Sequence, residues 1–84
     1  MQEKEIGKVA HYYGHLAVAI IELQDALKIG DNIHIKGHAS DFTQSVDSMQ
    51  IEHANVNEAA SGNVVGMKVS QKVHPHDKVY KITP

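Results

Sequence analysis

The stretch LKIGDNIHIKGHASDFTQSVDSMQIEHANVNEAASGNVVGMKV, residues 27–69, decides the fold class. Short runs of β-branched residues alternate in it with glycine turns, a pattern typical of antiparallel strands joined by tight connections. Ile33 and Ile35 alternate with polar neighbours, so their strand should have one apolar face and one hydrated face. The same alternation returns over residues 64–69. The stretch therefore predicts a β protein.

The segment 42–51 departs from strict alternation, because Val46 and Met49 lie three positions apart. A regular strand cannot place both side chains on one face. We therefore expect a β-bulge near Asp47 and Ser48, and both apolar side chains pointing inward. Such a bulge bends a strand, which is how small barrels turn their corners.

The remaining residues supply strands on either side. Residues 6–13 and 16–23 predict a hairpin, since both are rich in apolar and β-forming side chains and Gly14 and His15 separate them. A helix over residues 18–29 is the rival, because apolar positions there also recur at helical spacing. A closing strand follows the predicted turn at residues 74–77.

Together these elements predict an all-β fold, a small closed six- or seven-stranded antiparallel Greek-key barrel made as a single domain over residues 1–84. Closure is expected because it removes the open edges through which apolar strands aggregate.

Composition narrows the classes of function. The formal net charge is −2, and all eight basic residues are lysines, which argues against tight nonspecific nucleic-acid binding. Seven histidines would add positive charge on mild acidification. The chain has no cysteine, no apolar run of membrane-spanning length and a polar start, so we expect a cytoplasmic protein without membrane contact.

Several motifs in order resemble the second domain of translation elongation factor Tu and its relatives. The resemblance spans nearly the whole chain and rests on residues 7–9, 27–31, 46–51, 62–67 and 77–81. The last of these, DKVYK, is also similar to the close of small accessory barrels attached to collagenase-like peptidases. His76 stands where those families usually have glycine.

The resemblance implies a translation-factor-like binding module that is not an enzyme and docks on a protein, a tRNA or a ribonucleoprotein such as the ribosome. Residues 62–69 lack the spacing and the hydroxyl of a phosphate loop, so no nucleotide is expected. No cofactor is predicted, and DNA is not among the expected partners. One alternative is a detached accessory barrel of an RNA-modifying or collagenase-like peptidase-family enzyme. The other is a histidine-rich metal-binding protein, for which His74 and His76 would be candidate ligands.

Candidate partner-binding residues are polar or aromatic side chains expected on the outer surface. A basic and aromatic group lies near the first turn, a basic group follows the strand that ends at Gly37, and a polar pair follows the expected bulge. These candidates are Lys8, His11, Tyr12, His34, Lys36, His38, Gln50 and His53. Serine, aspartate and histidine near residues 45–53 could in principle serve catalysis, but such ingredients without a pocket do not define an active site. No catalytic residue and no metal ligand is predicted.

Overall fold

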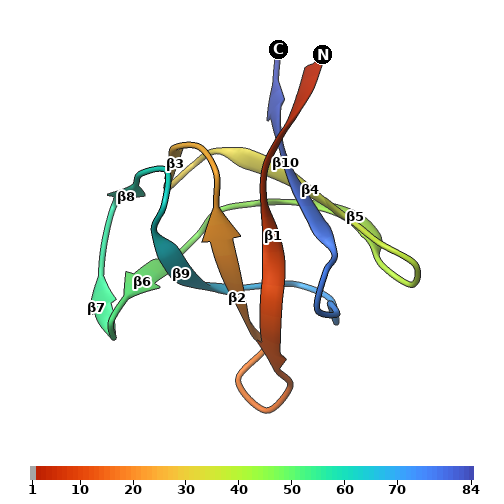
Figure 1. Cartoon of the computed structure of the whole chain (residues 1–84), viewed down its shortest axis with the longest axis horizontal. Coiled ribbons are helices and arrows are strands. Elements are labelled where there is room, and N and C mark those ends of the chain that lie inside the picture. The colour runs from red at the N-terminus through yellow and green to blue at the C-terminus, as the bar shows by residue number, and fades with distance from the viewer. Residues whose placement is uncertain (1) are drawn as a thin grey trace.

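The computed structural model describes residues 2–84, and these form strands and turns without a helix (Figure 1). No helix in this part of the chain could therefore span a bilayer. The strands are β1 (Gln2–Tyr13), β2 (Val18–Leu23), β3 (Leu27–Lys28), β4 (Asn32–Lys36), β5 (Asp41–Ser45), β6 (Met49–Ile51), β7 (Ala54–Asn55), β8 (Glu58–Ala59), β9 (Val64–Lys68) and β10 (Lys78–Thr83). The predicted all-β class is confirmed, and the helix considered for residues 18–29 is wrong because β2 and β3 together occupy most of that range.

Eight strands form one antiparallel sheet in the order β5-β4-β10-β1-β2-β9-β6-β7, and β3 and β8 form a separate two-stranded ribbon. The long strands β1 and β10 pair along their length, which brings the two ends of the chain together (Figure 1). The outermost strands β5 and β7 are not hydrogen bonded to each other. The sheet curls, but no strand ladder among the described residues closes it, so the closed form of the predicted barrel is not what the pairing shows.

Side chains, not a backbone ladder, connect β5 to the segment that follows β9. The Gln44 amide donates to the carbonyl of Lys68 at 2.9 Å and accepts from the Ser70 N–H at 2.7 Å. Farther along, the Ser40 hydroxyl donates to the carbonyl of Lys72 at 3.3 Å. These bonds satisfy backbone groups that a neighbouring strand would otherwise pair. The seam is therefore bridged without an additional strand.

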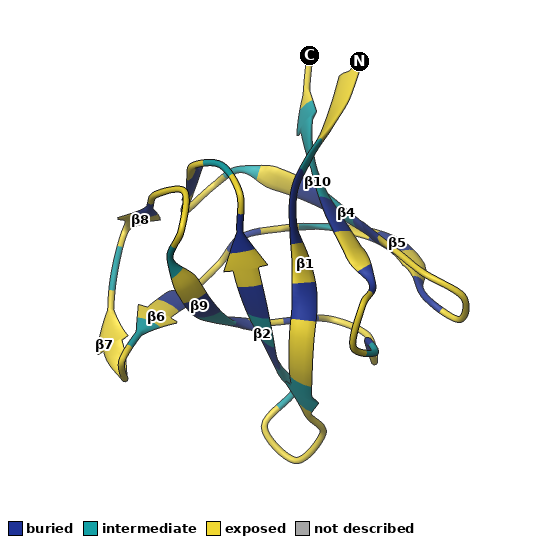
Figure 2. Cartoon of the chain, in the orientation of Figure 1, coloured by how far each residue is buried: buried dark blue, intermediate teal, exposed yellow. Residues whose placement is uncertain are grey.

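The inward side chains form one apolar cluster enclosed by the curled sheet. Buried and less buried positions alternate along β2 (Figure 2), and the expected inward positions Ile33 and Ile35 are 0% exposed. The largest buried side chains are Ile6, Ile21, Leu27, Ile33, Ile35, Met49 and Met67, with Val9, Val46, Val65, Val73 and Val79. Period-two patterning therefore identified the inward side chains of β4 and β9 correctly.

The segment expected to be one bulged strand is two strands separated by a break. β5 ends at Ser45 and β6 begins at Met49, while Val46 and Met49 are both 1% exposed. Their inward orientation is confirmed, but it arises from a corner in the chain and not from a bulge. Before the corner β5 pairs with β4 and the Val46 N–H donates to the Asp31 carbonyl, and after it β6 pairs with β9. Register shifts occur instead in β1, between residues 5 and 7 and between residues 9 and 11.

Replacing Met49 with Asp should abolish folding. Met49 lies opposite Met67 in the β6–β9 pair, and both are 1% exposed. An unpaired carboxylate there costs several kcal/mol, against a typical total stability of about 5–15 kcal/mol. Far-ultraviolet circular dichroism and urea unfolding measure the loss. The matched control Gln50→Asp changes the exposed neighbour and should keep the native spectrum; a folded M49D protein would contradict the assigned core.

Candidate functional site

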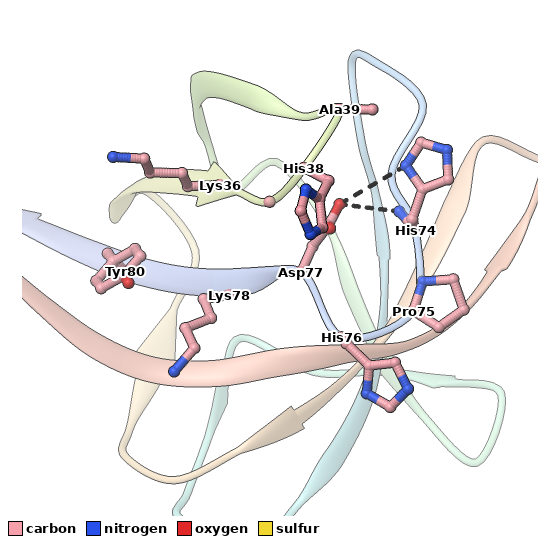
Figure 3. A pocket seen from close by; sticks show the side chains of 10 residues that line it. Lys36, His38, Ala39, His74, Pro75, His76, Asp77, Lys78 and Tyr80 are labelled. Atoms are coloured by element: carbon pink, nitrogen blue, oxygen red, sulfur yellow. Dashed lines mark hydrogen bonds and ion pairs between the residues drawn. The ribbon is translucent and has the colours of Figure 1, made fainter.

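A cavity of about 660 Å³ opens on the surface where the β4–β5 hairpin meets the turn before β10 (Figure 3). The hairpin and the turn form its walls, and the start of β10 continues its surface. The lining residues are Lys36, Gly37, His38, Ala39, His74, Pro75, His76, Asp77, Lys78 and Tyr80. We call this cavity the hairpin pocket.

The turn at residues 74–77 is fixed by the carboxylate of Asp77, which is 4% exposed. Its Oδ2 accepts from the backbone N–H of His74 at 2.9 Å, and the Asp77 N–H donates to the His74 carbonyl at 3.1 Å. The neighbouring His76 adopts φ = 76°, a left-handed conformation that glycine adopts more readily. Two backbone hydrogen bonds attach the turn to β1. The His76 N–H donates to the Val9 carbonyl at 2.8 Å, and the Val9 N–H donates to the Asp77 carbonyl at 2.8 Å.

The hairpin reaches this turn because residue 37 is glycine. A Cβ at Gly37 would overlap the Asp77 carboxylate. The hairpin itself closes through a 2.7 Å bond from the Gly37 N–H to the Ser40 carbonyl. Gly37 and Asp77 therefore pack directly against each other and set the distance between the two walls of the pocket.

Three lysines lie side by side at one side of the pocket. Lys36 on β4 is directly opposite Lys78 on β10, and Lys78 is directly opposite Lys8 on β1. All three are exposed, and directly opposed residues point to the same face of a sheet. We call Lys8, Lys78 and Lys36 the lysine row.

The carboxylates around the lysine row neutralise it only in part. Lys8 Nζ lies 3.8 Å from Glu22 Oε1 and Lys78 Nζ lies 3.4 Å from Glu5 Oε1, both in exposed surroundings where such pairs contribute little. Lys36 makes no ion pair with any residue in the range 2–84. The row therefore presents positive charge on a protein whose net charge is −2.

His34 is held between two carboxylates beside the row. Its Nδ1 lies 2.8 Å from Glu3 Oε1 and its Nε2 lies 2.5 Å from Asp41 Oδ1, and its side chain is only 15% exposed. The hydrogen bond with Asp41, and then that with Glu3, raises the pKa of His34, while His34 lowers the pKa of Asp41. The protonated ring can donate to both carboxylates, whereas a neutral ring can donate to only one. This network joins β1, β4 and β5.

The predicted contact residues do not form one site. Lys36 and His38 line the hairpin pocket, and Lys8 belongs to the lysine row. The other five lie in separate surroundings. His34 is in the network just described, His11 contacts the Tyr13 ring at 4.5 Å, Tyr12 packs partly against the core, Gln50 bonds Asn55, and His53 occupies the β6–β7 turn with φ = 65°.

Sequence reasoning missed the contribution of β10 and the turn before it. Lys78 and Tyr80 were not among the predicted contact residues, and His74 and His76 were considered only as metal ligands. The signal that would have found Lys78 is strand register, which places it between two predicted lysines. Among residues 2–84, no three histidine, aspartate or glutamate side chains gather closely enough to hold a metal ion.

Comparison with known sequences relates the chain to peptidases. No family model matches it. Over 77 residues, or 90% of the chain, it is 44% identical to an uncharacterized protease of Methanocaldococcus jannaschii, of which the match covers 19%. It is 34% identical over 82 residues, or 95% of the chain, to a collagenase of Porphyromonas gingivalis, of which the match covers 23%. The chain thus spans about a fifth of the length of the curated relatives it matches.

Comparison with solved structures shows the fold. The C-terminal domain of a protein described as a U32 peptidase candidate, from Geobacillus thermoleovorans, superimposes with a TM-score of 0.89, covering 95% of this chain and 93% of that one at 20% identity. Its selenomethionine variant gives a TM-score of 0.87. The curled sheet described above is therefore the fold of that C-terminal domain.

These relatives correct the predicted identity. The resemblance to domain 2 of elongation factor Tu was wrong, and so was the leading prediction of a translation module that docks on RNA or ribosomes, because the relatives are named as peptidases. The prediction that the chain is not an enzyme is contradicted by the same names, although the match covers only part of each relative. Glycine and valine spacing reports the backbone of a small barrel, and a backbone is shared by unrelated functions. The peptidase alternative fits the relatives better.

Substituting Gly37 with Ala should destabilise the protein by about 1–3 kcal/mol, because the new methyl group overlaps the Asp77 carboxylate. Urea unfolding measures the effect. Gly14→Ala is the matched control, since a Cβ there meets only Tyr12 at 3.7 Å. In the double variant G37A/D77A the two costs should not add, because they share one contact; simple additivity would argue against direct packing.

The His34 network should make stability depend on pH. A histidine whose native pKa is raised above 6.5 stabilises the fold fully below that pH, and the contribution is lost as pH rises through the native pKa. The free energy of unfolding of the native protein should therefore exceed that of His34→Gln by more at about pH 5.5 than at about pH 8.5. His15→Gln, in the exposed β1–β2 turn, is the control. An equal difference at both pH values would exclude the doubly donating ring.

Proposed function

We propose that this chain acts as the C-terminal β domain of a peptidase of the U32 type, and that it holds polypeptide substrate for the catalytic part of the enzyme. The observation that carries the proposal is the 44% identity to a protease over 90% of the chain, supported by the TM-score of 0.89 to a C-terminal domain. The catalytic part corresponds to the four-fifths of the relatives that the match leaves uncovered.

An apolar area on the outer face of β2 and β9 supports contact with such a catalytic part. Val64 is 50% exposed, and Val18 and Ile20 are partly exposed on the same face. The side chains of Val18 and Ile20 lie close to Gly66, since a Cβ at Gly66 would be 3.6 Å from Val18 Cγ1 and 3.6 Å from Ile20 Cδ1. Exposed apolar area of this kind is commonly buried against another protein surface.

The proposal includes two finer features. In the assembled enzyme the curled sheet behaves as a closed Greek-key barrel, because Gln44 and Ser40 bridge the seam that the backbone leaves open. The protein works in the cytoplasm, since a chain without cysteine depends on no oxidising compartment for its stability.

Exchange of the matching segment tests the function. The Porphyromonas gingivalis collagenase would be prepared in three forms: intact, with its matching segment deleted, and with that segment replaced by this chain. Cleavage and binding of denatured collagen would be measured for each form. We expect deletion to lower cleavage by about a hundredfold through loss of substrate positioning, and replacement to restore most of it.

Two controls make the exchange interpretable. Replacement by the M49D chain, which should not fold, must fail to restore cleavage. Replacement by a chain carrying Ile20→Lys and Val64→Glu should retain binding of denatured collagen but lose cleavage, because it alters the proposed contact with the catalytic part. If the deleted form still cleaves and binds denatured collagen as well as the intact enzyme, the proposed function is wrong.

A further inference from the structure

We propose that the lysine row and the hairpin pocket together form a binding site for a carboxylate of a polypeptide. The carboxylate is either the C-terminus of the bound polypeptide or one of its aspartate or glutamate side chains. This inference rests on the proposed function and names the chemical feature of the substrate that this domain recognises.

Strand register is the first argument. Like charges placed directly opposite each other in a sheet are destabilising, and here two such pairs share Lys78. Neighbouring strands lie about 4.8 Å apart, so three ammonium groups on flexible stems can converge on one anion. A bound carboxylate would remove the repulsion that the row carries by itself.

The second argument is that, within the lysine row, the nearby acidic side chains pair only with Lys8 and Lys78, through Glu22 at 3.8 Å and Glu5 at 3.4 Å in exposed surroundings. Asp41 lies opposite Lys36 across β4 and β5, yet its carboxylate is bonded to His34. Asp77 is buried, and its Oδ2 accepts from the His74 backbone. Lys36 lines the pocket and makes no ion pair within 4.0 Å with any described residue, while its charge helps to lower the pKa of Asp41.

The third argument is the character of the adjoining pocket. His38 and His76 line it, and their rings can donate hydrogen bonds to an anion (Figure 3). His74 also lines it, with its Nδ1 3.9 Å from Asp77 Oδ2. Tyr80, Pro75 and Ala39 supply apolar surface for the remainder of a bound chain. Its volume of about 660 Å³ lies in the range of ordinary ligand pockets.

The same features favour a polypeptide over a nucleic acid. The sequence contains no arginine, whose planar fork suits phosphate, and Tyr80 is the one tyrosine, phenylalanine or tryptophan that lines the pocket. The net charge of −2 would also repel a long polyanion. A peptide that carries a single carboxylate and few other charges is attracted by the lysine row without that general repulsion.

Peptide titration of the whole chain tests the site. The probe is the collagen-like hexapeptide Gly-Pro-Ala-Gly-Pro-Ala, acetylated at its N-terminus, used as the free acid, as the C-terminal amide, and as an amide with glutamate at the third position. Binding would be followed through the backbone amide signals of Lys8, Lys36 and Lys78 in nuclear magnetic resonance. We expect the free acid or the glutamate peptide to bind about tenfold more tightly than the plain amide. The preferred peptide identifies the source of the carboxylate.

Lysine variants link the preference to the row. In K36Q/K78Q the advantage of the carboxylate peptide should disappear, and in Lys8→Gln it should fall by about threefold. Lys28→Gln, on the separate ribbon strand β3, should leave it unchanged and serves as the matched control. Circular dichroism establishes that each variant is folded.

The possible results separate this inference from the proposed function. Equal binding of acid and amide peptides, or no binding of either, overturns the carboxylate site even if the segment exchange restores cleavage. Tighter binding of a ten-nucleotide polyuridine RNA at the same row also overturns it. A carboxylate preference that depends on Lys36 and Lys78 supports the site, and it would do so even if the segment exchange failed.

Discussion

The packing of Asp77 against Gly37 is the constraint on which the functional surface depends. The Asp77 carboxylate holds the turn at residues 74–77 through the His74 N–H, and its backbone carbonyl accepts from Val9 on β1. The β4–β5 hairpin can approach because position 37 has no side chain. The turn then delivers Lys78 to its position between Lys8 and Lys36. One close contact thus holds the two walls of the pocket together, beside the strands whose register concentrates charge.

Charge distribution separates the structural ion pairs from the surface available to a ligand. His34 uses both ring nitrogens on Glu3 and Asp41, and this joins three strands on the outer face of the sheet. That arrangement occupies the carboxylate of Asp41, the residue opposite Lys36. The hydrogen bond between His34 and Asp41 therefore both joins the strands and keeps Asp41 from forming an ion pair with Lys36. An acidic protein can in this way carry a local group of positive charges.

The comparisons place this surface in a peptidase context. The relatives are about five times longer than the chain, and the solved neighbour is a C-terminal domain. A small β domain beside a catalytic part can position a substrate without contributing reacting groups from a deep cleft. In the proposed arrangement, the open pocket would face the substrate and the half-exposed apolar face of β2 and β9 would face the catalytic part.

The sequence by itself determined the β class, most of the core and the principal turns. Alternation identified Ile33, Ile35 and Val65 as inward, and glycine marked the turns at Gly30 and Gly62, where φ is 93° and 91°. These features are local, because side-chain period and backbone sterics act over a few residues. The motifs could not specify the function, since glycine and valine spacing reports backbone geometry and a backbone is shared by unrelated functions.

Only the tertiary structure decided which strands are neighbours, how far the sheet closes and where the lysines meet. Lys8, Lys36 and Lys78 are separated by up to 70 positions in the chain, and their alignment depends on the pairing of β1, β10 and β4. Pairing over such separations is set by burial of the whole core and by contacts such as Gly37 with Asp77. No local pattern encodes it, and for that reason the site emerged from the fold and not from the motifs.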